Sequence, residues 1–188
     1  MLGRCVTAFA LILAGIAPAG ATSYAPVTFS ELVARADVIF IGEVVDVRPF
    51  PLRTREGTVI KTRVIFRVSD PISGTSSALE VLDFFGGEWG GIGMAIADMP
   101  RFAVGDRRVV FARREQSINP IVGFTQGLLQ IRRDAGGVDR VLTLGGAPLA
   151  QPESIGASAP VRGSVQAAPM RLTELRTRIS QALAAPRR

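Results

Sequence analysis

Histidine is absent from this chain of 188 residues, and Cys5 is its only cysteine. Ser-His-Asp and Cys-His nucleophile systems need these side chains, and so does nearly every zinc site. Lysine is equally scarce, so a Ser–Lys dyad would have to use Lys61, which the surrounding pattern places on the outward face of a strand. The sequence therefore excludes most nucleophilic and zinc chemistries, and we expect no metal and no cofactor.

The first 21 residues have the pattern of a secretory signal peptide. Arg4 supplies a positive charge, Cys5 to Ile16 is a run of twelve mainly apolar residues, and Ala19-Gly20-Ala21 is a small-residue cleavage site. A membrane-spanning helix needs about 20 apolar residues, so this run is too short for an anchor. We expect a periplasmic or secreted mature protein without cysteine, which packing rather than disulfides has to hold together.

The formal net charge of +6 is concentrated near the C-terminus. Residues 22–161 contain 15 basic and 15 acidic side chains, whereas residues 162–188 contain six arginines and a single acid, Glu174. A nucleic-acid-binding face needs a basic stripe across a folded surface, which a basic tail does not supply. We therefore expect no nucleic-acid partner.

Alternation of apolar and polar residues dominates the chain before residue 146. It is clearest from Val59 to Val68, and Thr28 and Glu31 have the capping-box spacing that begins a short helix. The pattern predicts a mainly β fold, either a small antiparallel β-barrel (OB-like) or a sandwich, with one short N-terminal helix. The predicted strands are Val38–Val47, Val59–Val68, Leu79–Phe85, Arg107–Arg114, Pro120–Phe124, Gly127–Arg133 and Val138–Leu144, and Pro49–Gly57 is predicted to be the connection between the first two.

The composition changes after Gly146. Residues 147–169 are rich in Ala, Pro, Ser, Gly and Gln, which is typical of a flexible linker, and the apolar residues that follow have the spacing of a basic amphipathic helix. That helix docks on its own domain, contacts a partner or an anionic membrane surface, or frays. Its apolar residues are Leu172, Leu175, Ile179 and Leu183. We expect a signal peptide (1–21), a β-barrel domain (22–146), a flexible linker (147–169) and a C-terminal amphipathic helix with its tail (170–188).

The stretch from Phe84 to Phe102 is rich in glycine. A phosphate cradle needs glycines that lead directly into a helix N-terminus, but here Gly93 is followed by an alternating segment. A calcium loop needs several acids at alternate positions, and only Glu88 and Asp98 are present. The glycine pairs at 86–87 and 90–91 are therefore expected to reverse the chain tightly between strands.

Trp89, the only tryptophan, lies between those two glycine pairs. It either plugs the mouth of a barrel or stands out as a contact residue. We take Trp89, Gly87, Gly91 and Asp98 as the candidate partner-binding residues, and we assign no catalytic and no metal-binding residue.

Paired carboxylates are the one hydrolytic chemistry that the composition leaves open, because a glycosidase needs only two acids beside the bond that it cleaves. The candidates are Asp83, Glu88 and Asp98. The alternative interpretation is that all three are solvated acids of loops and strand ends.

Several spaced glycines and aromatics carry a family resemblance. Gly86-Gly87 precedes the turn Pro100-x-Phe102-x-x-Gly105, and Gly123 and Gln126-Gly127 follow in the segment VGFTQGLLQI. Over about residues 29–132, this order resembles a family of uncharacterised exported bacterial domains that occur alone or beside matrixin-type metalloprotease domains. The resemblance implies an OB-like or netrin-like barrel and carries no catalytic residue to this chain. The chain departs from that pattern at Asp98-Met99, and it has no HExxH zinc helix, so the resemblance lends it no protease activity.

Taken together, these features favour an exported, non-enzymatic binding module whose partner is a protein or an envelope component. One alternative is an inhibitor or escort module for a secreted protease. Another is a carboxylate-dependent hydrolase.

The cleavage site gives a direct prediction. Because Ala19-Gly20-Ala21 fits signal peptidase, the intact mass of the exported protein should correspond to a chain that begins at Thr22. A mature product that retains residues 1–21 would contradict the expectation of export.

Overall fold

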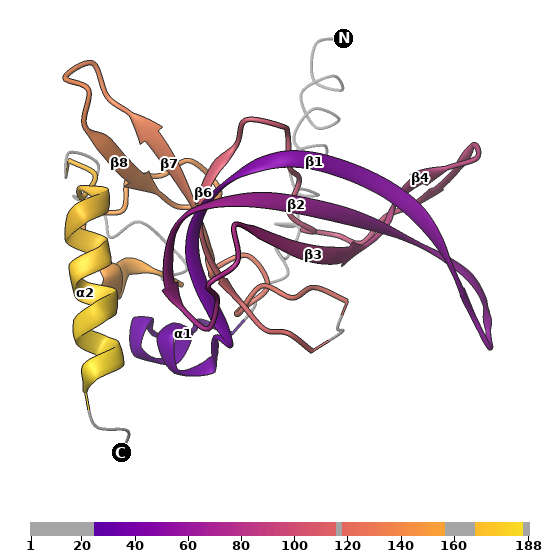
Figure 1. Ribbon diagram of the computed structural model, residues 1–188, viewed down its shortest axis with the longest axis horizontal. Helices are drawn as coiled ribbons and strands as arrows, with labels where there is room; N and C mark the ends of the chain where they lie inside the picture. The colour runs from indigo at the N-terminus through magenta and orange to yellow at the C-terminus, as the bar shows by residue number, and fades with distance from the viewer. Residues whose placement is uncertain (1–24, 116–117, 157–167, 186–188) are drawn as a thin grey trace, which may run out of the picture.

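The computed structural model describes residues 25–115, 118–156 and 168–185, so the expected signal peptide lies outside the described residues. It confirms the mainly β class, with one helix near the N-terminus and one near the C-terminus. A six-stranded antiparallel sheet has the order β3-β2-β1-β6-β7-β8, and β4 and β5 form a separate two-stranded sheet (Figure 1). The elements are α1 (Phe29–Arg35), β1 (Val38–Thr54), β2 (Gly57–Ser73), β3 (Leu79–Phe85), β4 (Gly87–Trp89), β5 (Ile92–Met94), β6 (Arg107–Ala112), β7 (Leu128–Arg133), β8 (Asp139–Leu142), the short 3-10 helix η1 (Pro152–Ser154) and α2 (Leu172–Ala184).

The six-stranded sheet is not a closed barrel, because its two edge strands, β3 and β8, do not pair with each other. The edge of β8 is taken by later parts of the same chain. Leu142 forms an isolated bridge with Pro148, and the Val141 N–H donates to the Met170 carbonyl at 3.1 Å. These segments occupy the backbone groups of β8 that closure onto β3 would need.

The segment predicted as a long connection, Pro49–Gly57, is strand up to Thr54, and Arg55-Glu56 alone makes the turn. Proline is disfavoured in the interior of a sheet because it cannot donate to the ladder. The prolines of this segment are tolerated because β1 pairs with β6 only as far as Glu43, and beyond that residue it pairs with β2 alone. The outer part of this hairpin, residues 48–63, extends beyond β6 as the β1–β2 arm, and only its residues 61–63 pair with a further strand, β3 (Figure 1).

The predicted strand Pro120–Phe124 is wrong. Only Ile121 forms a bridge, to Ala112, and the chain then turns at Gly123 and Phe124, whose φ angles of 65° and 66° are left-handed. A non-glycine residue in that region ends a strand, and the apolar pattern of these five residues gave no sign of it.

Both faces of the sheet are buried around the start of β1. Ile39 and Ile41 contribute to a cluster that lies under the helices, whereas Val38 and Phe40 point into a second cluster on the opposite face. Successive strand residues point to opposite faces, so this apolar run requires cover on both sides. The helices supply it on one face. On the other, the curled sheet packs around Phe66 and Phe84.

Helix α2 docks on its own domain, at the end of the molecule beside β8 (Figure 1). Leu175 and Ile179 are fully buried, and Arg176 forms an ion pair with Asp70 of β2 at 2.5 Å. The segment predicted as linker is also packed at its start, where Leu149 and Ile155 join the same cluster. The first part of the expected linker, up to Ile155, is therefore packed rather than flexible. Residues 157–167 lie outside the described residues.

The packing of α2 gives a testable prediction, and an exposed residue of the same helix serves as the control. Truncating Leu175 or Ile179 to alanine should lower the free energy of unfolding by about 2–5 kcal/mol, because each leaves a cavity in the core. Leu183→Ala, on the same helix but 38% exposed, should cost well under 1 kcal/mol. Urea denaturation measures the free energy of unfolding of the three variants. Equal, small losses of stability for Leu175→Ala and Leu183→Ala would contradict the docked helix.

A chain of residues 22–146, which lacks α2 and the segment before it, should fail to unfold cooperatively.

Candidate functional site

The glycine-rich stretch forms a β-hairpin. Strands β4 and β5 pair with Gly87 opposite Met94 and Trp89 opposite Ile92, so only Gly90-Gly91 is left for the turn. The φ angles of these two glycines are 59° and 78°, which fits the two-residue turn that matches the twist of a hairpin. The prediction that this glycine pair reverses the chain between strands is therefore confirmed.

The base of the hairpin is fixed to the β1–β2 arm. The Gly86 N–H donates to the Ile60 carbonyl at 2.8 Å, and the Thr62 hydroxyl donates to the Gly86 carbonyl at 2.7 Å. A Cβ on Gly87 would lie 2.5 Å from Thr62 Oγ1 and 3.2 Å from Pro49 Cβ, so the close approach needs glycine. At Gly87, the φ of 131° makes the same demand. The hairpin is thus held rigidly at its base while its tip extends beyond.

The tip presents two apolar side chains to solvent. Trp89 is 50% exposed and Ile92, directly across the hairpin, is 65% exposed. A tryptophan that plugged a barrel would be buried, so the plug interpretation is wrong, and the contact role of Trp89 stays a prediction. Sequence reasoning missed Ile92, although the two-residue spacing of Gly90-Gly91 already places it opposite Trp89.

Asp98, the fourth candidate, is not part of the hairpin. It follows β5 by four residues, is exposed, and takes a left-handed φ of 59° in a turn closed by the Met99 N–H and the Ile96 carbonyl. The structure therefore brings together Trp89, Gly87 and Gly91 but separates Asp98 from them by sequence and by element.

The three candidate acids have different surroundings. Both oxygens of Asp83 accept hydrogen bonds from Arg63, at 2.8 and 2.9 Å, and this pairing raises the pKa of Arg63 above its ordinary value. Glu88 lies exposed on β4, and Asp98 lies in the turn described above. Within the described ranges, no group of three or more acids, histidines or cysteines could hold a metal ion.

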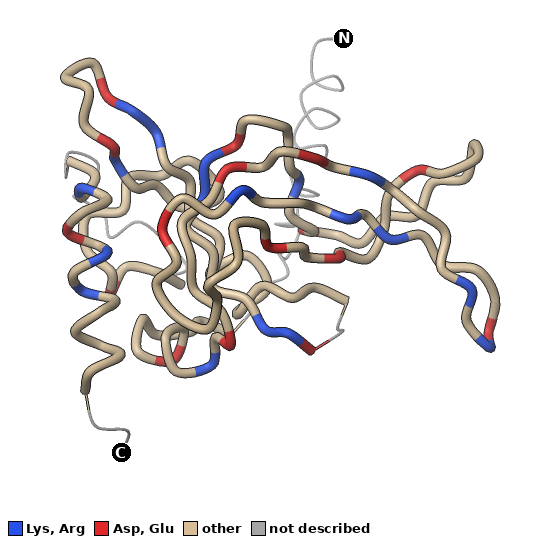
Figure 2. Tube along the Cα trace, viewed as in Figure 1, with Lys and Arg blue, Asp and Glu red and all other residues tan. Residues whose placement is uncertain are grey.

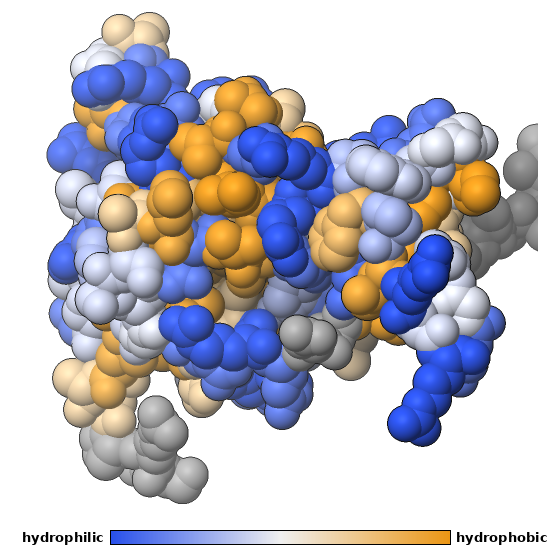
Figure 3. Space-filling view, turned by 45° about the vertical axis from the view of Figure 1, so that its right-hand side comes forward, coloured by the Kyte–Doolittle hydropathy of each residue, from blue (hydrophilic) through white to orange (hydrophobic). Residues whose placement is uncertain are grey.

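Charges of both signs are spread along the strands and helices (Figure 2). Many of them are paired locally, as Arg107 is with Asp139 across β6 and β8 at 2.7 Å. The hydrogen bond and charge of Arg107 hold the pKa of Asp139 below its ordinary range. Apolar side chains gather between the hydrophilic ones on the face that Figure 3 presents. Charges of both signs, many of them paired, thus alternate with apolar side chains on this face.

Two of the residues from which a family resemblance was expected make structural contacts. Phe102 packs against Phe66 and Phe84, with ring centroids 5.8 and 4.7 Å apart. The Gln126 amide accepts from the Val27 N–H at 2.8 Å and donates to the Ala25 carbonyl at 3.1 Å, so it ties the N-terminal segment to the sheet. Phe102 thus contributes to the packing of the sheet and Gln126 to the position of the N-terminal segment.

Comparison with models of protein families, with curated proteins and with solved structures found no match. None of the helices within the described ranges is long and apolar enough to span a membrane.

Replacing the glycines of the hairpin by alanine should destabilise the protein to different degrees. Gly91→Ala should destabilise by about 1–2 kcal/mol, because an L-residue is forced into a left-handed conformation in otherwise open space. Gly87→Ala should cost more, because the new Cβ also meets Thr62. Gly93→Ala, which has open space and an ordinary φ, is the matched control and should be close to neutral. Urea unfolding measures the three, and an equal cost at Gly91 and Gly93 would contradict the turn geometry.

Proposed function

We propose that this chain is an exported, non-enzymatic binding module, periplasmic or secreted, that recognises a protein or an envelope component through the tip of hairpin β4–β5. The observation that carries the proposal is the exposed cross-strand pair of Trp89 and Ile92. Exposed tryptophan is costly to leave in water, and at interfaces it is the side chain most enriched among residues that dominate binding energy.

The hairpin has the features of a preorganised contact element. Its base is fixed by the hydrogen bonds of Gly86 and by the close packing of Gly87 against the arm. Its turn consists of two glycines, so the turn itself places no side chain beside the indole. Little conformational freedom is then lost when the tip binds, which favours affinity.

The composition supports a binding role over catalysis, because the expected mature chain lacks histidine and cysteine. Of the three candidate acids, Asp83 is engaged by Arg63. An inhibitor or escort of a secreted protease would use the same hairpin, and the identity of the captured partner separates the two roles. Membership of the exported bacterial family that the motif order resembles is part of the same proposal.

Trp89 tests the proposal in two steps. Because the indole is the only one in the chain and is half exposed, its fluorescence should be red-shifted and quenched by iodide. Trp89→Ala should change the free energy of unfolding by less than about 1 kcal/mol, compared with about 3–5 kcal/mol for a buried aromatic. Blue-shifted, unquenchable emission would rule out the contact role.

The second step is capture of a partner. Immobilised mature protein should recover the same exported protein or envelope component when wild type or Val104→Ala is used, and lose it with Trp89→Ala. Val104 is the control because it is 67% exposed and lies on the loop before β6. Equal recovery by all three proteins would refute a contact through the hairpin tip.

A further inference from the structure

The two edges of the six-stranded sheet are treated differently. Segments of the same chain bond to the edge of β8, at Leu142 with Pro148 and at Val141 with Met170. The edge of β3 receives one such bond, from the Phe85 N–H to the Ile118 carbonyl at 2.9 Å. An uncovered edge strand is a template for pairing with another extended chain.

The hydrogen-bond ladder between β2 and β3 shows which backbone N–H and C=O groups of β3 do not pair with β2. The Gly86 N–H donates to the Ile60 carbonyl, and the Val68 N–H donates to the Ala78 carbonyl, so even-numbered residues of β3 face β2. The odd-numbered residues point their N–H and C=O groups away from β2. Phe85 belongs to this outward row. No described residue bonds to the outward backbone N–H and C=O groups of the other three, Leu79, Val81 and Asp83.

A hollow of about 180 Å³ runs along this free edge. One wall is β3 from Glu80 to Asp83, and the opposite wall is formed by residues 113–115 with Pro120. Because the hollow is bounded on both sides, it suits a single extended segment. A strand that belongs to the sheet of a second copy would bring its neighbouring strand into the opposite wall.

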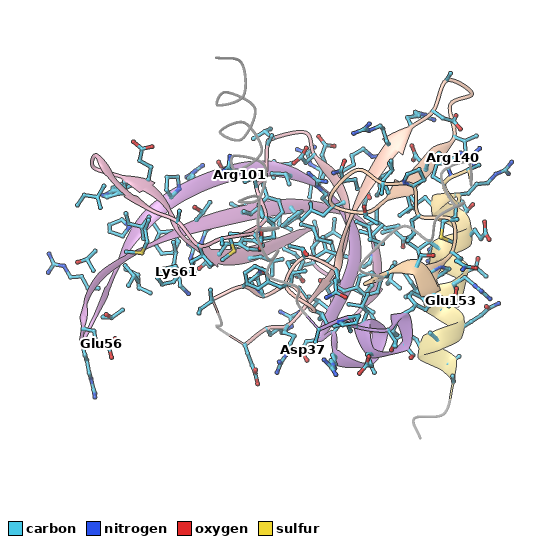
Figure 4. All side chains as sticks on the ribbon, turned by 180° about the vertical axis from the view of Figure 1, so that it is seen from behind. Asp37, Glu56, Lys61, Arg101, Arg140 and Glu153 are labelled. Carbon is cyan, nitrogen blue, oxygen red and sulfur yellow. The ribbon has the colours of Figure 1, made fainter. Side chains whose placement is uncertain are left out.

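A second hollow, of about 430 Å³, lies near the end of β3 under the β1–β2 arm. Its apolar lining comes from the arm, from β3 and from the loop before Asn119, namely Leu52, Val59, Phe85 and Ile118. Lys61 borders both hollows, and Figure 4 places it between the tip of the arm, marked by Glu56, and the body of the sheet.

Lys61 is the cation in the first hollow without a counter-ion among the described residues. Arg113 pairs with Glu115 at 2.6 Å, and Arg114 lies 3.6 Å from Glu80. Asp83 is engaged by Arg63 from outside the hollow. Among the described residues that line the first hollow, the charge left to attract a ligand is therefore positive, and its side chain also lines the second hollow.

We propose that the free edge of β3 binds an extended peptide segment of a partner protein by strand addition, with an acidic group of the peptide on Lys61 and an apolar side chain in the hollow under the arm. The alternating free groups of Leu79, Val81 and Asp83 supply the main-chain hydrogen bonds, and Lys61 supplies selectivity for acid. This site is separate from the tip of hairpin β4–β5, so each can fail without the other.

The test uses a synthetic peptide, acetyl-Thr-Val-Thr-Val-Glu-Val-Thr-amide, and the mature protein in NMR titration. Binding should shift the amide signals of Leu79, Val81 and Asp83 and slow their hydrogen exchange. Two further peptides carry a methyl group on the backbone nitrogen of every second residue, one at the odd and one at the even positions (the two methylation phases). One of them should lose binding and the other should keep it, because only one row of peptide amides faces β3. No shift at these amides up to millimolar peptide, or equal loss in both phases, would overturn the proposal.

Variants of the protein sharpen the result. Val81→Pro removes an outward N–H that the ladder with β2 does not use, so the fold should persist while binding weakens by about tenfold or more. Val81→Thr keeps both the N–H and the branched shape and should bind like wild type. Lys61→Glu should weaken binding of the acidic peptide and strengthen binding of the peptide that has lysine in place of glutamate. Unchanged binding by Val81→Pro, or the same preference for acid in Lys61→Glu, would refute the site.

Self-association is the remaining outcome. If the protein alone is a dimer by analytical ultracentrifugation and Val81→Pro makes it a monomer while Val81→Thr does not, the occupant of the edge is a second copy. That result would overturn the assignment to a partner peptide. A monomeric wild-type protein that binds the peptide in one methylation phase supports it.

Discussion

The burial of β1 on both faces is the constraint on which the rest of this fold depends. Four successive apolar residues, Val38 to Ile41, alternate between two clusters, so neither face of the strand can be left to water. One cluster requires α1 and α2, including the fully buried Leu175 and Ile179 far along the chain. The other requires that β2, β3 and the loop with Phe102 curl around Phe40. The central position of β1 between β2 and β6 follows from this double burial.

The same arrangement decides which parts of the molecule stay exposed. Since β1 and β2 continue beyond the last residue that pairs with β6, they form an arm with a free surface on which Gly86 and Gly87 anchor a second hairpin. Since the C-terminal segment that feeds α2 covers β8, the opposite edge at β3 is the one left uncovered. The bonded edge of β8 and the free backbone groups of β3 therefore belong to the same arrangement of the chain.

The local elements were predictable where neighbouring residues alone decide them. The bounds of β3 agree to the residue with the alternation in LEVLDFF, and the capping box of Thr28 and Glu31 forms as its spacing indicates. Predictions were wrong where distant contacts prevail. Pro49 and Pro51 lie inside β1 because that part of the strand has one neighbour only, and Phe124 ends a predicted strand by taking a left-handed conformation. The exposure of Trp89 was equally beyond local pattern, since it depends on where the hairpin leaves the arm.

The sequence by itself determined the mainly β class, the tight reversal at Gly90-Gly91, and the lack of histidine and of any cysteine after Cys5, because each depends on residue type and short-range spacing. Only the tertiary structure decided that α2 docks, that the barrel stays open, and that β3 keeps an uncovered edge. Each of these features depends on contacts between surfaces that are distant in the sequence. Asp70 and Arg176, for example, are 106 residues apart and meet only in the folded chain.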